Sequence, residues 1–306
     1  MCKPHKCPHG TCIYCPGGPN STFGNVPQSY TGGEPATMRA IRNNFDPYLQ
    51  IFNRLEQYVL LGHNFEKIEL IIMGGTFPSF PKKYQEEFIK FTFKALNDFS
   101  GLFFNKNGEL NYTKFKDVYE LPTENFSDKE RTLRIQKKLL KLKGKTTLTK
   151  EQKINETAKV RCVALCIETK PDWGLLDHGN HMLKLGTTRI ELGVQSVYED
   201  VIKKVNRGHT VKDTKDSIRI LKDLGFKVAI HYMPGLPLTS KKRDLEGMIS
   251  LFKNPDFKPD MLKIYPTMVS KGTILYKEYK EGKFKPLSIK DAAELLVKFK
   301  KHVPKY

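Results

Sequence analysis

Three cysteines near the start of the chain form the most chemically specific feature of the sequence. Cys7, Cys12 and Cys15 fall within nine residues with the spacing C-x4-C-x2-C, and Tyr14 precedes the third. Glycine and proline flank them, which indicates a loop and not a helix or a strand. A loop of this kind can hold three thiolates around one metal centre. The sequence therefore predicts a metal site here, and the first question is which metal it binds.

Three kinds of metal centre fit this spacing. A structural zinc ion would take the three thiolates and His9 as a fourth ligand, because zinc favours closed four-coordinate sites. An iron–sulfur cluster used for electron transfer is normally ligated by four cysteines. A [4Fe–4S] cluster held by three cysteines would leave one iron open for a small molecule. The local spacing supports the zinc site and the open cluster about equally, so the rest of the chain has to decide.

The charge of the chain points to a polyanionic partner. The 306 residues include 52 Lys and Arg and 33 Asp and Glu, which gives a formal net charge of +19. Lys and Arg that neutralise phosphates release condensed counterions, so such an excess favours nucleic-acid binding. A lysine-rich proteome adapted to high temperature is the alternative explanation. We favour a nucleic-acid partner on this basis.

The cysteine usage and hydropathy bear on the compartment. Six cysteines in a chain this long, three of them in one loop, do not resemble a disulfide framework and suit a reducing compartment. No apolar run is long enough to cross a membrane, and no signal peptide precedes the cysteine loop. We expect a cytoplasmic protein with no membrane partner. Cys162 and Cys166 fall on one face of a predicted strand and are expected to be buried, inert thiols.

An alternation of strand and helix patterns must position the cysteine loop. Near-continuous apolar runs predict strands buried on both faces, as in a parallel sheet. Alternation with right-handed crossovers implies a parallel sheet or barrel. Residues 1–6 make a poor strand, so we expect a partial TIM-type (β/α)6 barrel whose first strand is missing or truncated. Strands are predicted at 67–73, 160–168, 188–194, 226–233 and 261–265, and helices at 34–42, 47–61, 82–99, 173–184, 198–205, 211–224, 241–252, 273–279 and 288–302.

Residues 105–157 interrupt this alternation. They lack buried-strand patterns, and between Asp128 and Lys159 eleven Lys or Arg face four Asp or Glu. We interpret 1–306 as one barrel domain with a basic surface insertion at about 105–157, helical around 128–142 and 149–158. A solvated helical pair and direct contact with RNA are equally supported there.

The predicted strand ends form a consistent rim. In barrels of this kind, functional residues lie on loops that follow the C-terminal ends of strands. Gly74 and Gly75 would let a ligand approach the backbone closely, because no Cβ intervenes. The rim segments are 74–76, 168–172, 195–196, 233–237 and 265–267.

The sequence resembles a known family, the radical S-adenosylmethionine domain of the Elongator catalytic subunit in its short archaeal form. The resemblance runs nearly from end to end, and the matching strings are long and specific. They are residues 7–19 (CPHGTCIYCPGGP), 28–32 (QSYTG), 34–40 (EPATMRA), 73–77 (MGGTF), 189–196 (RIELGVQS), 231–237 (HYMPGLP) and 263–267 (KIYPT).

The resemblance implies cofactors and the residues that hold them. Cys7, Cys12 and Cys15 would ligate three irons of a [4Fe–4S] cluster and so act as the catalytic cysteines, and the fourth iron would chelate S-adenosylmethionine. One electron would then cleave the sulfonium and yield a 5′-deoxyadenosyl radical, chemistry that belongs to the cofactors. The implied S-adenosylmethionine contacts are Tyr14 near the adenine, Gly74, Gly75 and Thr76 along the methionine, and Gln195, Met233, Pro234 and Gly235 at the ribose and adenine.

The resemblance also implies a reaction and its partners. The radical would take hydrogen from the methyl group of acetyl-CoA, the co-substrate, and the carbon radical would add to C5 of the wobble uridine of a tRNA. The positive charge would bind the anticodon stem-loop, whose bases unstack easily. An electron donor, whose identity the sequence does not indicate, is also required. Lys263 and Tyr265 match family positions linked to substrate binding, and Arg39, Arg42, Lys170 and Arg207 are candidate RNA-phosphate contacts.

The chain departs from the family in two respects. Full-length members carry a C-terminal acetyltransferase-like domain that handles acetyl-CoA, and this sequence stops at Tyr306 before any such domain. Lys170 stands where arginine is expected, and lysine cannot make arginine's bidentate contact. The alternative function is therefore a tRNA-binding scaffold with a structural iron–sulfur or zinc site and no radical turnover.

Overall fold

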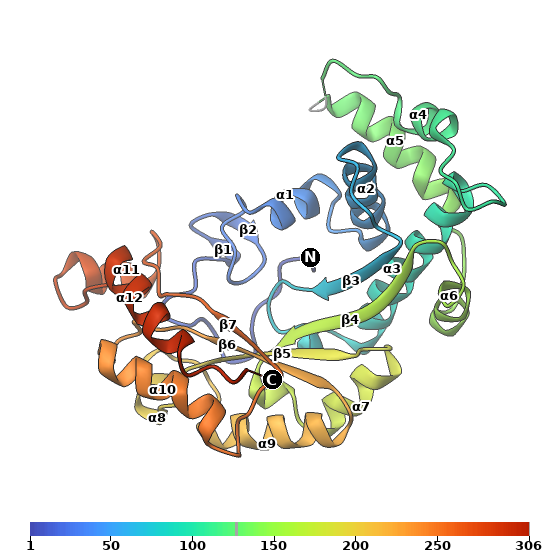
Figure 1. Ribbon diagram of the computed structural model, residues 1–306. Coiled ribbons are helices and arrows are strands. Elements are labelled where there is room, and N and C mark those ends of the chain that lie inside the picture. The colour runs from blue at the N-terminus through green and yellow to red at the C-terminus, as the bar shows by residue number, and fades with distance from the viewer. Residues whose placement is uncertain (126–127, 306) are drawn as a thin grey trace. The chain divides into compact units, whose positions relative to one another are not determined.

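The computed structural model describes residues 1–125 and 128–305 of the protein (Figure 1). The chain divides into two compact units, which are described separately. The first unit contains Met1, Met38–Leu70 and Pro81–Leu165, and the second contains Cys2–Thr37, Ile71–Phe80 and Cys166–Tyr306. Strands β3 (Lys67–Ile72) and β4 (Arg161–Thr169) each begin in the first unit and end in the second.

A five-stranded sheet carries the predicted alternation, with the strands in chain order β3-β4-β5-β6-β7. The pairs β4/β5, β5/β6 and β6/β7 are parallel. This confirms the predicted α/β fold with a partial parallel barrel. The strands are β3 (Lys67–Ile72), β4 (Arg161–Thr169), β5 (Arg189–Gln195), β6 (Lys227–Tyr232) and β7 (Met261–Ile264).

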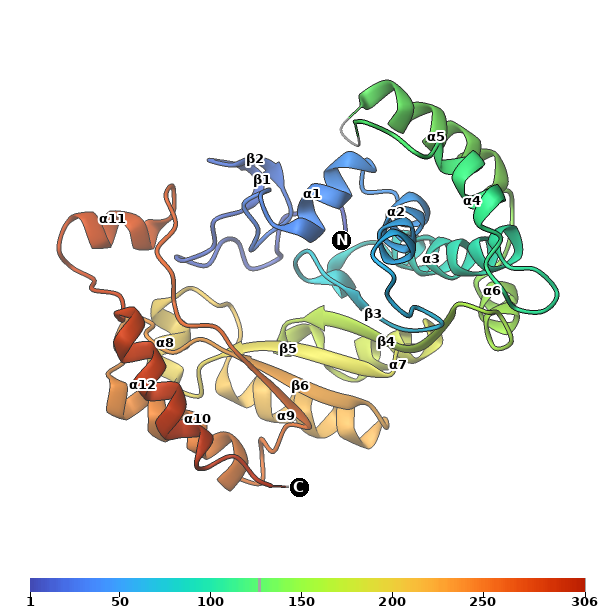
Figure 2. The same ribbon diagram turned by 45° about the horizontal axis from the view of Figure 1, so that its top comes forward.

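Burial on both faces explains why these apolar runs are strands. Every residue of β5 up to Val194 is buried, as expected for a central strand of a parallel sheet. In Figures 1 and 2, helices α7 (Leu176–Lys184), α9 (Val211–Asp223) and α10 (Lys241–Lys253) lie on one side of β5 and β6. The opposite side of these strands is left for the segments that carry the cysteines.

The cysteine loop is followed by a hairpin that the sequence did not predict. Strands β1 (Gly18–Ser21) and β2 (Gly24–Val26) pair in antiparallel fashion in a segment for which no strand was predicted. Residues 1–17, all of which the structure describes, contain no strand.

The first unit is a helical layer around an aromatic core. Asp46 caps helix α2 (Pro47–Leu60) by accepting a hydrogen bond from the Leu49 amide at 3.1 Å, and Pro47 occupies the first turn. The insertion contributes Phe115, Tyr119 and Ile135 to this core, so it is part of the interior of the unit as well as its basic surface. Residues 126 and 127 of the insertion lie outside the described residues.

None of the helices that the structure describes is long and apolar enough to cross a membrane.

The helices agree with the predicted ones except for α4, which was not predicted. The remaining helices are α1 (Pro35–Arg42), α2 (Pro47–Leu60), α3 (Lys82–Phe103), α4 (Tyr112–Tyr119), α5 (Lys129–Leu142), α6 (Leu148–Asn155), α8 (Glu199–Lys204), α11 (Ile274–Lys280) and α12 (Ile289–Lys300).

Two glycines inside helices predict opposite effects of the same substitution. Gly101 in α3 is exposed, and an added Cβ would meet no atom within 4 Å. We expect Gly101→Ala to stabilise the protein by about 1 kcal/mol through helix propensity. A Cβ on Gly247 in α10 would lie 2.4 Å from the hydroxyl oxygen of buried Tyr232. We expect Gly247→Ala to destabilise by about 1–3 kcal/mol. Denaturant unfolding of the two variants checks both signs, and a stabilised Gly247→Ala would contradict the packing described here.

Candidate functional site

The second unit contains a cavity of about 350 Å³ at the C-terminal ends of its strands. Its walls come from the cysteine loop, the segment after β2, and the ends of β3, β4, β5 and β6. Ten of the predicted site residues line it: Cys7, Tyr14, Cys15, Gly75, Thr76, Lys170, Gln195, Arg207, Met233 and Tyr265. The structure thus brings together residues that are far apart in the sequence.

The cysteine loop is fixed by contacts with distant segments of the second unit. Buried Ile13 donates its amide to the Val205 carbonyl at 3.2 Å, and its own carbonyl accepts from the Leu275 amide at 2.9 Å. The side-chain amide of Asn206 donates to the Thr11 carbonyl at 2.9 Å. These bonds satisfy the backbone of a segment that has no regular structure of its own.

Each of the three sulfurs has a polar neighbour. Cys15 Sγ accepts a hydrogen bond from the Ser29 amide at 3.3 Å, and Cys7 Sγ lies 3.8 Å from Thr76 Oγ1. Cys12 Sγ lies 3.5 Å from Arg207 Nη1 and 3.3 Å from His9 Nε2. Donors aimed at sulfur favour the thiolate over the thiol.

The pKa values of two of these thiols are raised, which opposes the deprotonation that metal binding requires. Burial raises the pKa of Cys7, and the positive charges of Arg207 and Lys170 act against that rise. Burial also raises the pKa of Cys15, with the Ser29 hydrogen bond acting in the opposite direction. Because the thiolate is the form that binds metals, the nearby cations and donors prepare a buried site for ligation.

Arg207 ties the cysteine loop to the sheet. Its Nη2 and Nε donate to the Gly193 carbonyl at 2.6 and 3.1 Å, while Nη1 faces Cys12. The guanidinium therefore places a fixed positive charge next to three potential thiolates.

The spacing of the sulfurs tests the zinc interpretation. Two sulfurs on one tetrahedral zinc ion, with Zn–S bonds of about 2.3 Å, lie about 3.8 Å apart. Across the described residues, Cys7, Cys12 and Cys15 do not form a group whose ligand atoms all lie within 4.8 Å of one another. At least one pair of these sulfurs therefore lies farther apart than two sulfurs bound to one zinc ion.

Strand ends supply the remaining predicted cofactor contacts. Gly74 and Gly75 have φ values of +118° and +100°, a conformation that favours glycine, and Gln195 at the end of β5 has φ +70°. Pro234 accepts hydrogen bonds from the amide and hydroxyl of Thr267, each at 2.9 Å. Gly235 donates its amide to Asp244 at 2.7 Å and lines a neighbouring pocket.

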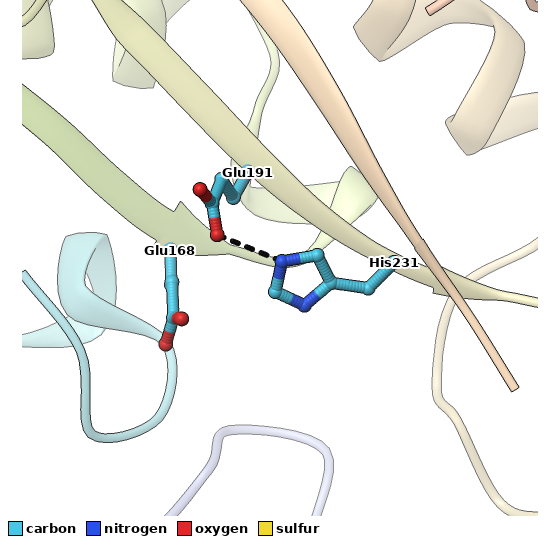
Figure 3. A group of neighbouring side chains, drawn as sticks. All are labelled: Glu168, Glu191 and His231. Atoms are coloured by element: carbon cyan, nitrogen blue, oxygen red, sulfur yellow. Dashed lines mark hydrogen bonds and ion pairs between the residues drawn. The ribbon is translucent and has the colours of Figure 1, made fainter. Parts of the chain in front are cut away.

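Side chains on adjacent strands form a charged cluster on the cavity wall (Figure 3). Glu191 is 1% exposed and lies 2.8 Å from His231 Nε2, 2.5 Å from Lys263 Nζ and 2.9 Å from Arg189 Nη2. Although burial opposes ionisation, hydrogen bonds from His231 and Lys263 lower the pKa of Glu191 to about 2.

Glu168 completes this cluster from β4. One ligand atom from each of Glu168, Glu191 and His231 lies within 4.8 Å of the other two (Figure 3). Because Lys263 and Arg189 already neutralise Glu191, the cluster is not a good binding site for a divalent cation. Lys263, a predicted substrate contact, therefore lies beside the cavity as the partner of Glu191.

The candidate RNA contacts differ in exposure. Lys170 is buried and hydrogen-bonded to Asp172 at 3.2 Å, so both it and Arg207 belong to the cavity wall. A phosphate would have to enter the cavity to reach them. In the first unit, Arg42 is exposed and Arg39 is partly buried.

Several cavity residues were not predicted as site residues. Gln28, Ser29 and Tyr30 follow the unexpected hairpin, and Glu168 and Glu191 occupy strand positions. An acidic residue inside a buried strand is the signal that could have identified the two glutamates, because such a charge needs partners.

Of the other cysteines, Cys166 is buried as expected, whereas Cys162 is only partly buried. Burial raises the pKa of Cys162 and of Cys166 to about 12 in each case, so both thiols stay protonated and inert at neutral pH. Cys2 is buried.

Two glycines near the cysteine loop allow a test of whether the contact with His9 positions the cysteines. Gly208 has φ +72°, and a Cβ there would lie 2.3 Å from the Cβ of His9. Gly10 has φ +90°, but its Cβ would meet no atom within 4 Å. Both substitutions to alanine strain the backbone, and only Gly208→Ala displaces the loop. We expect the purified Gly208→Ala protein to hold clearly less metal than Gly10→Ala by elemental analysis. Equal metal content would show that the His9 contact does not position the cysteines.

Comparisons with known proteins identify the family. The model of the radical SAM superfamily matches residues 2–251, and that of the radical SAM C-terminal domain matches residues 259–306. The chain is 46% identical over 306 residues to the tRNA uridine(34) acetyltransferase of Methanocaldococcus infernus, covering 100% of this chain and 49% of the relative. It is 42% identical to Elongator complex protein 3 of Saccharomyces cerevisiae over 309 residues, which covers 99% of this chain and 48% of that protein.

A solved structure of an archaeal relative has a similar fold. The archaeal Methanocaldococcus infernus Elp3 with an N-terminal deletion superposes with a TM-score of 0.70 at 43% identity, covering 87% of this chain and 52% of that one. The chain spans about half the length of the curated relatives it matches. With a family model that matches most of its length, the chain belongs to the radical S-adenosylmethionine superfamily.

Proposed function

We propose that this chain is the radical-generating part of an enzyme that modifies C5 of the wobble uridine of tRNA with a carboxymethyl-type group from acetyl-CoA. The main observation in support is the cavity that contains Cys7 and Cys15 beside strand-end glycines, in a chain 46% identical to a tRNA uridine(34) acetyltransferase. The formal charge of +19 supports a polyanionic substrate.

The residues of the cavity fit the cofactors that the superfamily implies. Cys7, Cys12 and Cys15 would hold three irons of a [4Fe–4S] cluster, with S-adenosylmethionine on the fourth. The proposed S-adenosylmethionine contacts are Tyr14, Gly74, Gly75, Thr76, Gln195, Met233, Pro234 and Gly235. Bound together, these cofactors supply a radical that takes a hydrogen atom from the co-substrate.

The chain's own residues would position these groups and limit water. Arg207 would hold a positive charge beside the thiolates, and the Ser29 amide would orient Cys15. Gln195 would fix the ribose at the end of β5. Tyr265, which lines the cavity, and Lys263, which is bonded to Glu191 in the cavity wall, are proposed as substrate contacts.

The proposed partners follow from the same reaction. Arg39 and Arg42 are proposed contacts of the anticodon stem-loop. Lys170 and Arg207 are proposed contacts of the part that enters the cavity when the wobble base unstacks. The reaction needs an electron donor, and acetyl-CoA use would require an acetyltransferase-type domain such as the relatives' names indicate. We propose a cytoplasmic location, because cysteines that ligate a metal centre must stay reduced, and a reducing compartment keeps them so.

A tRNA-binding scaffold with a structural metal site is the second candidate. The basic composition supports it as well as it supports the enzyme. The two functions differ in whether S-adenosylmethionine is cleaved.

Cys12→Ser separates the cluster from RNA binding. In the reduced, reconstituted wild-type protein, we expect tRNA and acetyl-CoA to promote formation of 5′-deoxyadenosine. Cys12→Ser should abolish the cluster and this product, yet leave tRNA affinity largely intact, because phosphate contacts carry most of that affinity. Chromatography of the nucleoside and filter binding of the tRNA measure the two effects.

Three other results would be informative. An intact cluster with no 5′-deoxyadenosine would favour the scaffold. A colourless protein with one zinc ion and no iron after anaerobic purification would exclude the radical enzyme. Loss of tRNA affinity in Cys12→Ser would mean that the cysteine loop also determines the fold.

A further inference from the structure

Four titratable side chains converge on one face of the sheet because of its register. Glu168 on β4 is level with Glu191 on β5. Glu191 is level with Ala229 on β6, and His231, two residues further on, shares that face. His231 is in turn level with Lys263 on β7. Figure 3 shows Glu191 pointing toward His231, with Glu168 beside them on the neighbouring strand.

The two carboxyl groups of this cluster have opposite environments. Glu191 is held by Arg189, His231 and Lys263 and is ionised. The carboxyl group of Glu168 makes no hydrogen bond or ion pair with any other residue that the structure describes, and burial raises its pKa. Neighbouring carboxyls whose pKa values are pushed apart are the usual sign of an acid–base pair with divided roles.

The proposed reaction requires a proton acceptor that its cofactors do not provide. When a carbon radical adds to C5 of a uracil ring, one new C–C bond forms and one unpaired electron remains at C6. Restoring the C5=C6 double bond requires that C5 lose its hydrogen as a proton. The unpaired electron must leave at the same stage to a one-electron acceptor, for which an oxidised iron–sulfur cluster is the appropriate class. The proton needs a base within the cavity.

We propose that Glu168 is the base that accepts the C5 proton of the uracil ring. Glu168 lines the same cavity as Cys7 and Cys15, and its carboxyl oxygens are not committed to a partner. In this role the carboxylate takes the proton while the C5–H bonding pair becomes part of the restored double bond. The inference rests on the proposed function and adds a residue to it.

The other groups on this wall are poorer bases. Burial raises the pKa of Tyr30 and of Tyr265, so both keep their hydroxyl protons at neutral pH. Despite burial, the hydrogen bond to Glu191 raises the pKa of Lys263, which remains an ammonium. Glu191 is buried and neutralised by three cationic or donor groups. His231 has one nitrogen engaged with Glu191 and is the rival acceptor.

Tritium at C5 of the wobble uridine provides a direct test. The reconstituted chain, supplemented with the acetyltransferase part of a relative, is given acetyl-CoA and an anticodon stem-loop labelled at that position. Tritium released to water is measured per 5′-deoxyadenosine formed. This ratio reports proton loss separately from cleavage of S-adenosylmethionine. We expect Glu168→Gln to lower the ratio about 100-fold, the range typical for loss of a general base. Glu168→Asp should retain part of it.

Controls separate the base from other roles. Glu156→Gln makes the same change at an exposed glutamate paired only with Lys153 on the helical surface, and should leave the ratio at the wild-type value. His231→Asn should reduce the ratio less than Glu168→Gln does. Equilibrium binding of S-adenosylmethionine to Glu168→Gln should match the wild type, which a ligand role for Glu168 would not allow.

The possible failures are distinct. A wild-type tritium ratio in Glu168→Gln, a larger loss in His231→Asn, or a loss of S-adenosylmethionine affinity in Glu168→Gln would each overturn the assignment of Glu168 while leaving the proposed function in place. If the wild-type protein formed 5′-deoxyadenosine and released no tritium, modification at C5 would itself be excluded, and the role of Glu168 with it.

Discussion

The arrangement of the second unit depends on holding three cysteines of an irregular loop beside the ends of a parallel sheet. A loop without internal structure cannot do this alone, so distant parts of the chain satisfy its backbone. The carbonyl of Val205 at the end of α8 and the amide of Leu275 in α11 both bond to Ile13. Arg207 extends from the same region to Gly193 and Cys12, and so joins the loop, the sheet and a compensating positive charge. If that contact network were lost, the sulfurs would have neither a fixed position nor a favourable charge.

The parallel register has an equal part in building the cavity wall. Strands β4 to β7 place Glu168, Glu191, His231 and Lys263 on one face, because paired residues of adjacent strands point the same way. Burial of Glu191 would be costly for an isolated carboxylate, and three donors from β5, β6 and β7 offset that cost. The same donors leave Glu168 without a partner. One strand register thus produces both a neutralised carboxylate and an available one.

The features that could be predicted from sequence are those with local causes. The run Lys67–Ile72 and the later strands are apolar, short and bounded by glycine or proline, so their positions followed directly. The C-x4-C-x2-C loop carried its chemistry in its spacing. Helix α4 was missed because it has only eight residues and its start depends on Asn111 capping the Lys114 amide. The β1–β2 hairpin was missed because its strands contain glycine and polar residues where apolar alternation is expected.

The remaining features arise from contacts between positions distant in the chain. Nothing near Ser29 indicates that its amide bonds to Cys15, and nothing near Arg207 indicates that it faces Cys12. Lys170 was expected to be available to RNA, yet its ammonium is buried beside Asp172 in the wall of the cavity. Glu168 could be placed at a strand end from sequence, but its lack of a partner depends on how Lys263 and His231 are shared with Glu191.

The most direct test of the central claim is anomalous scattering at the iron edge from crystals of the anaerobically reconstituted protein. The account predicts four iron positions at the cavity, three bonded to Cys7, Cys12 and Cys15 and a fourth with no side-chain ligand. It also predicts that density for S-adenosylmethionine, when added, contacts that fourth iron. A single zinc ion ligated by the three sulfurs and His9, or a protein side chain on the fourth iron, would contradict it.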